Sequence, residues 1–173
     1  MVVSYFPAGR KSKATPALRR GWRGSETVGS SLERLMGAQR AMRSRFDDFH
    51  RALERGDRAT LEVALIDFDE NFRRWSLAEE QTLLPALARL ALAGRDPQRE
   101  LRLEYAQIRE ITALLRRRLA EGLRPADLFG FADNLNVRLA AHEAGMEGIY
   151  YPAADAILLP HERKALERAC PEP

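Results

Sequence analysis

The sequence is poor in the residues that build metal cages and covalent cross-links. Its 173 residues include one cysteine, Cys170, and three histidines, His50, His142 and His161. A single cysteine excludes an internal disulfide framework and a multi-cysteine zinc site, and three histidines exclude a histidine-rich metal cage. The apolar runs also fall far short of the roughly 18 residues that a bilayer span needs, which excludes a transmembrane protein.

Acidic residues are absent from the first 25 positions. This segment holds six of the 28 Lys and Arg residues, which leaves 22 basic against 25 acidic residues in the remainder. The net charge of +3 is therefore a property of the N-terminal tail, residues 1–29. A slightly acidic body argues against nucleic-acid binding. We expect the tail to be flexible and to contact an acidic protein partner.

The tail also lacks the apolar stretch of 7–15 residues that a secretory signal requires. Its arginine-rich, acid-free start resembles an organellar transit peptide, but it forms no convincing amphipathic helix. We therefore expect a cytoplasmic protein.

Apolar residues recur at intervals of three and four, which predicts helices with one face turned to a core. The predicted helices cover roughly residues 30–55, 57–94, 96–122 and 125–152, with a short helix at 162–169. Long helices joined by short loops predict an all-α, up-down-up-down antiparallel four-helix bundle. We place the bundle at residues 30–159 and a C-terminal extension at residues 160–173.

Each apolar stripe is interrupted at mid-helix, where the middles of the helices meet. The stripe of the fourth helix runs Leu128, Phe131, Leu135, Leu139, His142, Met146 and Ile149. The six residues expected to converge on one central layer are Gln39, Trp75, Glu79, Tyr105, His142 and Met146. A carboxylate such as Glu79 is not left bare in an apolar core, so it must pair, accept hydrogen bonds or become protonated.

This pattern resembles the hemerythrin-like family, in particular its HHE cation-binding branch. That family places a lone histidine on the first and third helices and a His-x-x-x-Glu pair on the second and fourth. The matching segments are Ala38-Gln39, Trp75–Glu80 with Leu83-Leu84-Pro85, Glu104-Tyr105, and His142–Glu147 with Tyr150-Tyr151-Pro152. Steps of 36, 30 and 37 residues between the four positions repeat the family's long-short-long spacing, and the resemblance covers about residues 32–159.

The resemblance implies a diiron centre, and the ligand positions are where this sequence departs from the family. Gln39, Trp75 and Tyr105 stand in place of histidines, and Met146 stands in place of a glutamate. Two surviving ligands, Glu79 and His142, cannot satisfy two irons, and the replacements are poor donors for a hard metal. We therefore expect the standard diiron site to be absent and its space to be refilled by packing and hydrogen bonds.

Alternatives remain open for the two surviving ligand types. Glu79 and His142 could form a buried carboxylate–imidazole pair that bonds Gln39 or Tyr105 and fixes helix register. They could instead hold one metal ion with Tyr105, because a phenolate can bind ferric iron. They could also exchange a proton in acid–base chemistry, although the sequence has no nucleophile elbow, glycine-rich phosphate loop or His-Glu-x-x-His motif.

The sequence also allows predictions for two glycines near the layer and for the histidines and the cysteine outside it. Gly37 and Gly145 lie within helices, where a missing Cβ would permit close helix approach or a small cavity. His50 should be partly exposed, His161 should start a helix, and Cys170 has no partner that would activate its thiol.

Two function classes follow. The first is a non-enzymatic, cofactor-free module that meets an acidic partner through its tail and through the arginines of Arg73-Arg74 and Arg116–Arg118. The second, implied by the resemblance, is an iron protein that binds oxygen or nitric oxide through a non-standard site. Trp75 and Met146 distinguish the two classes. If their side chains fill the centre of the bundle, the iron protein of the second class has no room for its metal site.

Overall fold

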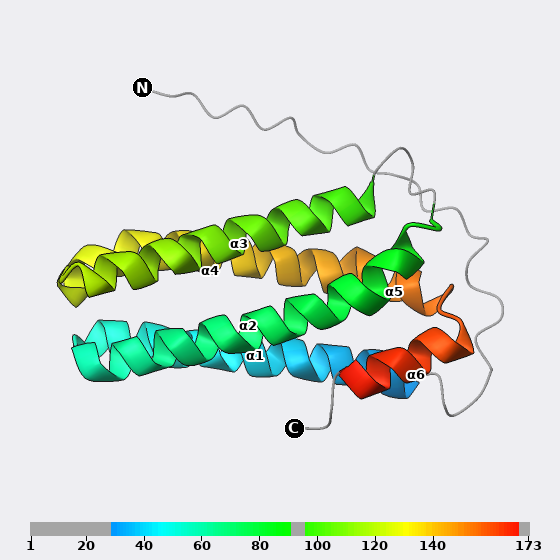
Figure 1. Cartoon of the computed structure of the whole chain (residues 1–173), viewed down its shortest axis with the longest axis horizontal. Helices are drawn as coiled ribbons and strands as arrows, with labels where there is room; N and C mark the ends of the chain where they lie inside the picture. Colours follow the sequence, from blue (N-terminus) through cyan, green and yellow to red (C-terminus); the bar gives the residue numbers. More distant parts are fainter. Residues whose placement is uncertain (1–28, 91–95, 170–173) are drawn as a thin grey trace.

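A computed structural model describes residues 29–90 and 96–169, and every regular element within these ranges is helical. The four long helices lie side by side and are α1 (Gly29–Arg55), α2 (Arg58–Leu87), α3 (Pro97–Ala120) and α4 (Phe129–Gly145) (Figure 1). The shorter elements are the 3-10 turn η2 (Pro125–Leu128), the π-helical turn η3 (Met146–Tyr150), α5 (Tyr151–Asp155) and α6 (Pro160–Ala169). The prediction of an all-helical bundle is confirmed. Residues 1–28 of the basic tail and Cys170 lie outside the described residues.

The helix boundaries follow the local signals in the sequence. The Asp57 carboxylate accepts a hydrogen bond from the Thr60 backbone N–H at 3.2 Å and caps α2. Asp96 caps α3 in the same way, immediately before Pro97 at the first helical position. Gly56 and Gly122 follow α1 and α3 with φ of 66° and 89°, a backbone conformation that glycine adopts most readily.

The core consists of the inward faces of the long helices. The apolar stripes of the first three helices are buried as expected from their period, from Leu32 and Leu35 in α1 to Leu119 in α3. The prediction was wrong for Ile149 of the fourth helix, which is 42% exposed. Ile149 lies in η3, whose wider turn rotates the chain by one residue relative to an α-helix and changes which residues face the core.

The end of the fourth helix also differs from the prediction. Pro152 does not terminate the helical path, because α5 continues directly from η3 and Pro152 occupies its first turn, where a missing N–H is tolerated. α6 then contacts α1 and α2 and buries Leu166. Arg89 of the loop after α2 pairs with Glu162 of α6 at 2.6 Å, and its hydrogen bonds lower the pKa of Glu162 to about 2.

The remaining histidines lie where the sequence placed them. His50 is partly exposed on α1, and His161 is exposed in the first turn of α6. None of the described helices is long and apolar enough to traverse a lipid bilayer.

Candidate functional site in the central layer

The structure buries all six side chains predicted for the central layer. Gln39 comes from α1, Trp75 and Glu79 from α2, Tyr105 from α3, His142 from α4 and Met146 from η3. None is more than 3% exposed. The layer is therefore shielded from solvent, and its polar atoms depend on one another for hydrogen bonds.

Glu79 is the centre of the hydrogen-bond network. Tyr105 Oη donates to Glu79 Oε2 at 2.5 Å. Tyr151 Oη lies 2.8 Å from Glu79 Oε1 and also 2.8 Å from Gln39 Oε1. Both carboxyl oxygens of Glu79 are thus engaged by tyrosine hydroxyls that come from two different elements, α3 and α5.

Tyr151 Oη lies near two acceptor oxygens, Gln39 Oε1 and Glu79 Oε1, and this arrangement favours a protonated Glu79. A single hydroxyl proton can serve either Gln39 or Glu79, but not both. If Glu79 carries a proton on Oε1, it donates to Tyr151, and Tyr151 then donates to Gln39, so that every group has a partner. Burial raises the pKa of Glu79 to about 7, against the opposing effects of the His142 charge and the tyrosine hydrogen bonds.

Tyr105 responds to the same surroundings. Burial and the neighbouring Glu79 carboxyl raise the pKa of Tyr105 well above its usual value of 10. The phenol therefore keeps its proton and acts as a hydrogen-bond donor toward Glu79.

His142 does not pair with Glu79, as one sequence-based alternative proposed. Its Nδ1 lies 2.7 Å from Glu104 Oε2, whereas Glu79 accepts its hydrogen bonds from tyrosines. The His142 ring packs edge-on against Trp75 and Tyr105, with centroid distances of 5.2 and 5.4 Å. The imidazole is held by aromatic rings on the inside and by a carboxylate near the surface.

Two buried nitrogen atoms of the layer lack a hydrogen-bond partner among the described residues. They are Trp75 Nε1 and His142 Nε2. An unpaired buried N–H costs free energy, and such atoms are rare in folded proteins. The side chains of the layer are thus closely packed, but these two nitrogen atoms are left without hydrogen bonds among the described residues.

Sequence reasoning missed Glu104 and Tyr151. In a continuous α-helix the residue one turn after Met146 that shares its face is Tyr150, four positions on. The five-residue turn of η3 brings Tyr151 into the layer instead, where its hydroxyl meets Glu79. In the sequence, Tyr150-Tyr151-Pro152 is part of the family pattern, but nothing in that pattern indicates that Tyr151 enters the layer. Glu104 carried no signal beyond its position next to Tyr105.

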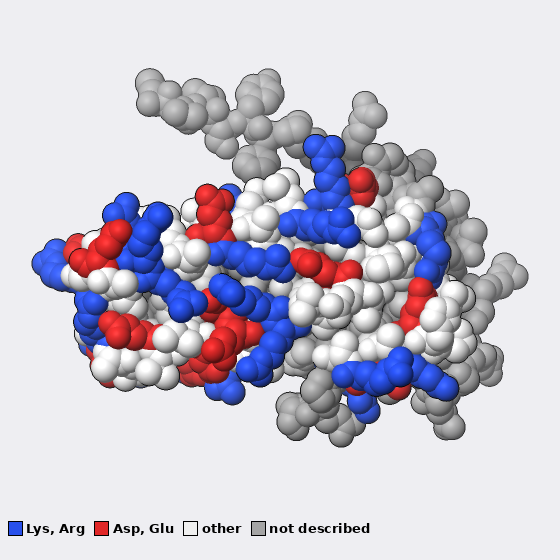
Figure 2. Space-filling view, in the orientation of Figure 1, with Lys and Arg blue, Asp and Glu red and all other residues white. Residues whose placement is uncertain are grey.

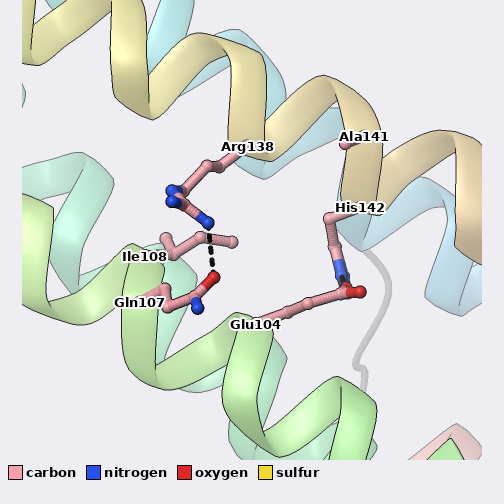
Figure 3. Close-up of a pocket in the computed structure, with 6 residues that line it drawn as sticks. All are labelled: Glu104, Gln107, Ile108, Arg138, Ala141 and His142. Atoms are coloured by element: carbon pink, nitrogen blue, oxygen red, sulfur yellow. Dashed lines mark hydrogen bonds and ion pairs between the residues drawn. The ribbon is translucent and has the colours of Figure 1, made fainter. Parts of the chain in front are cut away.

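A solvent-open cleft of about 200 Å³ lies between α3 and α4, beside the layer. Its lining residues are Glu104, Gln107, Ile108, Arg138, Ala141 and His142. Figure 3 shows Glu104 and His142 meeting at one side of the cleft, while Arg138 and Gln107 join across the other. His142 therefore connects the buried layer to a surface depression.

Neither glycine near the layer serves a close helix approach, which was one of the two expected roles. A Cβ at Gly37 would meet nothing within 4 Å, and one at Gly145 would meet only Tyr150 Cε2 at an ordinary 3.7 Å.

Gly37 therefore weakens α1 without a compensating contact. We expect Gly37→Ala to raise the free energy of unfolding by about 1 kcal/mol through helix propensity, measured by urea denaturation. A loss of stability would show that the space beside Gly37 is needed.

The arginine runs do not form a surface of one sign. Arg73 and Arg116 both pair with the buried Asp69, at 3.1 and 2.6 Å. Arg74 pairs with Glu70 and Arg118 with Glu121. Figure 2 shows basic and acidic side chains interspersed over the visible face. The pairs of Arg74 and Arg118 join exposed side chains and contribute little stability, and all four pairs reduce the net charge that these arginines offer a partner.

Within residues 29–90 and 96–169, no three His, Cys, Asp or Glu side chains gather as a group that could hold a metal ion. No curated protein and no solved structure matches the chain. Residues 30–154, however, match the family described as the hemerythrin HHE cation-binding domain. With its helical bundle and with the spacing of its central residues, the chain belongs to the hemerythrin HHE cation-binding domain family.

Proposed function

We propose that this chain is a hemerythrin-like module that has lost the standard diiron site and acts as a binding or structural partner rather than as an enzyme. The observation that carries the proposal is the engagement of both Glu79 oxygens by the hydroxyls of Tyr105 and Tyr151. A bridging carboxylate must direct a lone pair of each oxygen at a metal ion, whereas here each oxygen of Glu79 is occupied by a hydrogen bond with a phenol group.

The donor set is also a poor fit for two irons. The indole of Trp75 packs against His142 and supplies a donor N–H but no lone pair for a metal. Met146 offers a thioether, which suits soft metals, and the Gln39 carbonyl oxygen already lies beside Tyr151 Oη. We therefore derive no chemistry through a diiron centre in this chain.

We also propose that the four long helices follow an up-down-up-down order, which the short connections after α1 and α3 support. We propose a cytoplasmic location, no resident cofactor and an acidic protein partner for the basic segment 1–29. The first 25 residues of that segment include six basic residues and no acidic one, which supports the partner.

One observation favours a second candidate, an iron protein that binds oxygen or nitric oxide. A carboxylate on one ring nitrogen of a histidine is the usual support for a metal on the other nitrogen. His142 has Glu104 at Nδ1, and its buried Nε2 lacks a partner among the described residues. In this candidate His142, Glu79 and Tyr105 would hold a single iron.

Metal content separates the two candidates. The untagged chain, expressed in iron-supplemented medium, should contain substoichiometric iron by elemental analysis and show a featureless visible spectrum. About one iron per chain with a phenolate-to-iron band would support the second candidate. About two irons per chain would contradict the loss of the diiron site.

Restoring the family's ligand types should restore metal uptake. We expect the variant Gln39→His, Trp75→His, Tyr105→His and Met146→Glu to take up iron, because it regains the ligands that the family pattern implies. The matched control adds Glu79→Gln and should bind less iron. A folded fourfold variant that takes up no iron would contradict the assignment of these positions.

A further inference from the structure

The Tyr105–Glu79 pair combines an oxidisable phenol with a built-in proton acceptor. Removing an electron from a phenol makes its proton strongly acidic, so oxidation is far easier when a base is already hydrogen-bonded to the hydroxyl. Glu79 Oε2 lies 2.5 Å from Tyr105 Oη, and both side chains are fully buried. The proton need only move along an existing hydrogen bond.

Aromatic rings surround this phenol and extend toward the surface. The Tyr105 ring lies 6.1 Å from Trp75 and 5.4 Å from His142, measured between ring centroids. His142 lines the cleft between α3 and α4, which opens to solvent (Figure 3). A small molecule in the cleft would therefore be separated from Tyr105 by a single imidazole ring, a short path for electron transfer.

We propose that Tyr105 is a one-electron donor to small outer-sphere oxidants that enter the α3–α4 cleft, with Glu79 as its proton acceptor. The oxidant gains one electron from the Tyr105 phenol. The phenolic O–H bond breaks, its proton passes to Glu79 Oε2, and a neutral tyrosyl radical remains. Atoms and charge balance because the ionised Glu79 becomes neutral as the oxidant gains one negative charge.

The filled layer favours a long-lived radical. The Tyr105 ring is buried among carbon-rich neighbours, including Phe72 and Trp75, and has no access to solvent. Solvent and other radicals reach such a ring slowly. This activity is independent of iron, so it does not depend on the function proposed above.

Pulse radiolysis tests the proposal on the full chain. The oxidant is the azidyl radical, which takes one electron to become azide and is small enough to enter the cleft, at about pH 8 so that Glu79 is largely ionised. The wild-type chain should give the narrow visible band and the electron paramagnetic resonance signal of a long-lived neutral tyrosyl radical. Tyr105→Phe should lose that signal. Tyr150→Phe, which removes another tyrosine bonded to a glutamate, should keep it.

The role of Glu79 has its own readout. Glu79→Gln retains the shape of the carboxyl group but cannot accept the proton, so radical formation should slow by about a hundredfold or more. An unchanged rate would overturn the proton route, and a long-lived signal that persists in folded Tyr105→Phe would overturn the assignment of the donor. If Tyr105→Phe does not fold, fluorotyrosine at position 105 must alter the hyperfine splitting of the wild-type signal, and an unaltered splitting would refute the proposal.

Discussion

Glu79→Gln should flatten the dependence of stability on pH. The folded-state pKa of Glu79 is about 7, against a reference value of 4.5. Because the folded state holds this proton more tightly, its contribution is fully present below pH 4.5 and is lost as the pH rises through 7. Between about pH 4.5 and pH 8 the wild-type chain should therefore lose about 3 kcal/mol more stability than the variant.

Urea unfolding at the two pH values measures this difference. Glutamine should be tolerated at low pH because its amide can donate to Tyr151 and accept from Tyr105, as a protonated glutamate does. Glu143, whose pKa burial also raises, contributes equally in both proteins and cancels. The exposed Glu110 provides a matched control, since Glu110→Gln should follow the wild type. Parallel pH profiles for Glu79→Gln and wild type would show that Glu79 is ionised in the fold without penalty.

Trp75→Ala should produce the largest loss of stability in the layer. Trp75 is buried and its ring lies within 6.1 Å of those of Phe72, Tyr105 and His142. Removing a buried tryptophan leaves a cavity that the surrounding helices fill only in part, at a cost of about 3–5 kcal/mol. Chemical denaturation of the purified variant measures the loss.

Two further variants show whether packing is the cause. Trp75→Phe keeps an aromatic ring and removes the buried Nε1 N–H that lacks a partner among the described residues, so it should lose far less stability than Trp75→Ala. Leu77→Ala, at an exposed position two residues later, should change the free energy of unfolding by no more than about 0.5 kcal/mol. A mild effect of Trp75→Ala would mean that the centre is loosely packed and has room for a ligand.

Most of the fold could be predicted because periodicity and helix-ending residues act locally. Asp57, Asp96, Gly56 and Gly122 each set a helix boundary through groups a few residues away, and these signals are visible in the sequence. The apolar stripes of the first three helices hold for the same reason, since an uninterrupted α-helix keeps a constant period.

The candidate site was predictable only in part. Burial of the six central residues followed from their positions on the stripes, and this was correct. The hydrogen bonds of Tyr151 and Glu104 depend on the wide turn η3 and on the relative placement of α3 and α4, which no local pattern encodes. As a result Glu79 bonds Tyr105, as one alternative expected, but it bonds Tyr151 in place of His142, and His142 bonds Glu104.

Because of the wide turn η3, the tyrosine that meets Glu79 depends on the number of residues after Met146 as well as on which residues they are. One extra residue between Met146 and Tyr151 resets the phase of everything that follows, while the helix before it keeps its register. Neighbouring tyrosines stand at this point, so the gain of a single codon before them, with the wide turn kept, would put Tyr150 in place of Tyr151 opposite Glu79 without any substitution. The layer can thus be rewired by insertion, a route that point-by-point comparison of ligand positions does not detect.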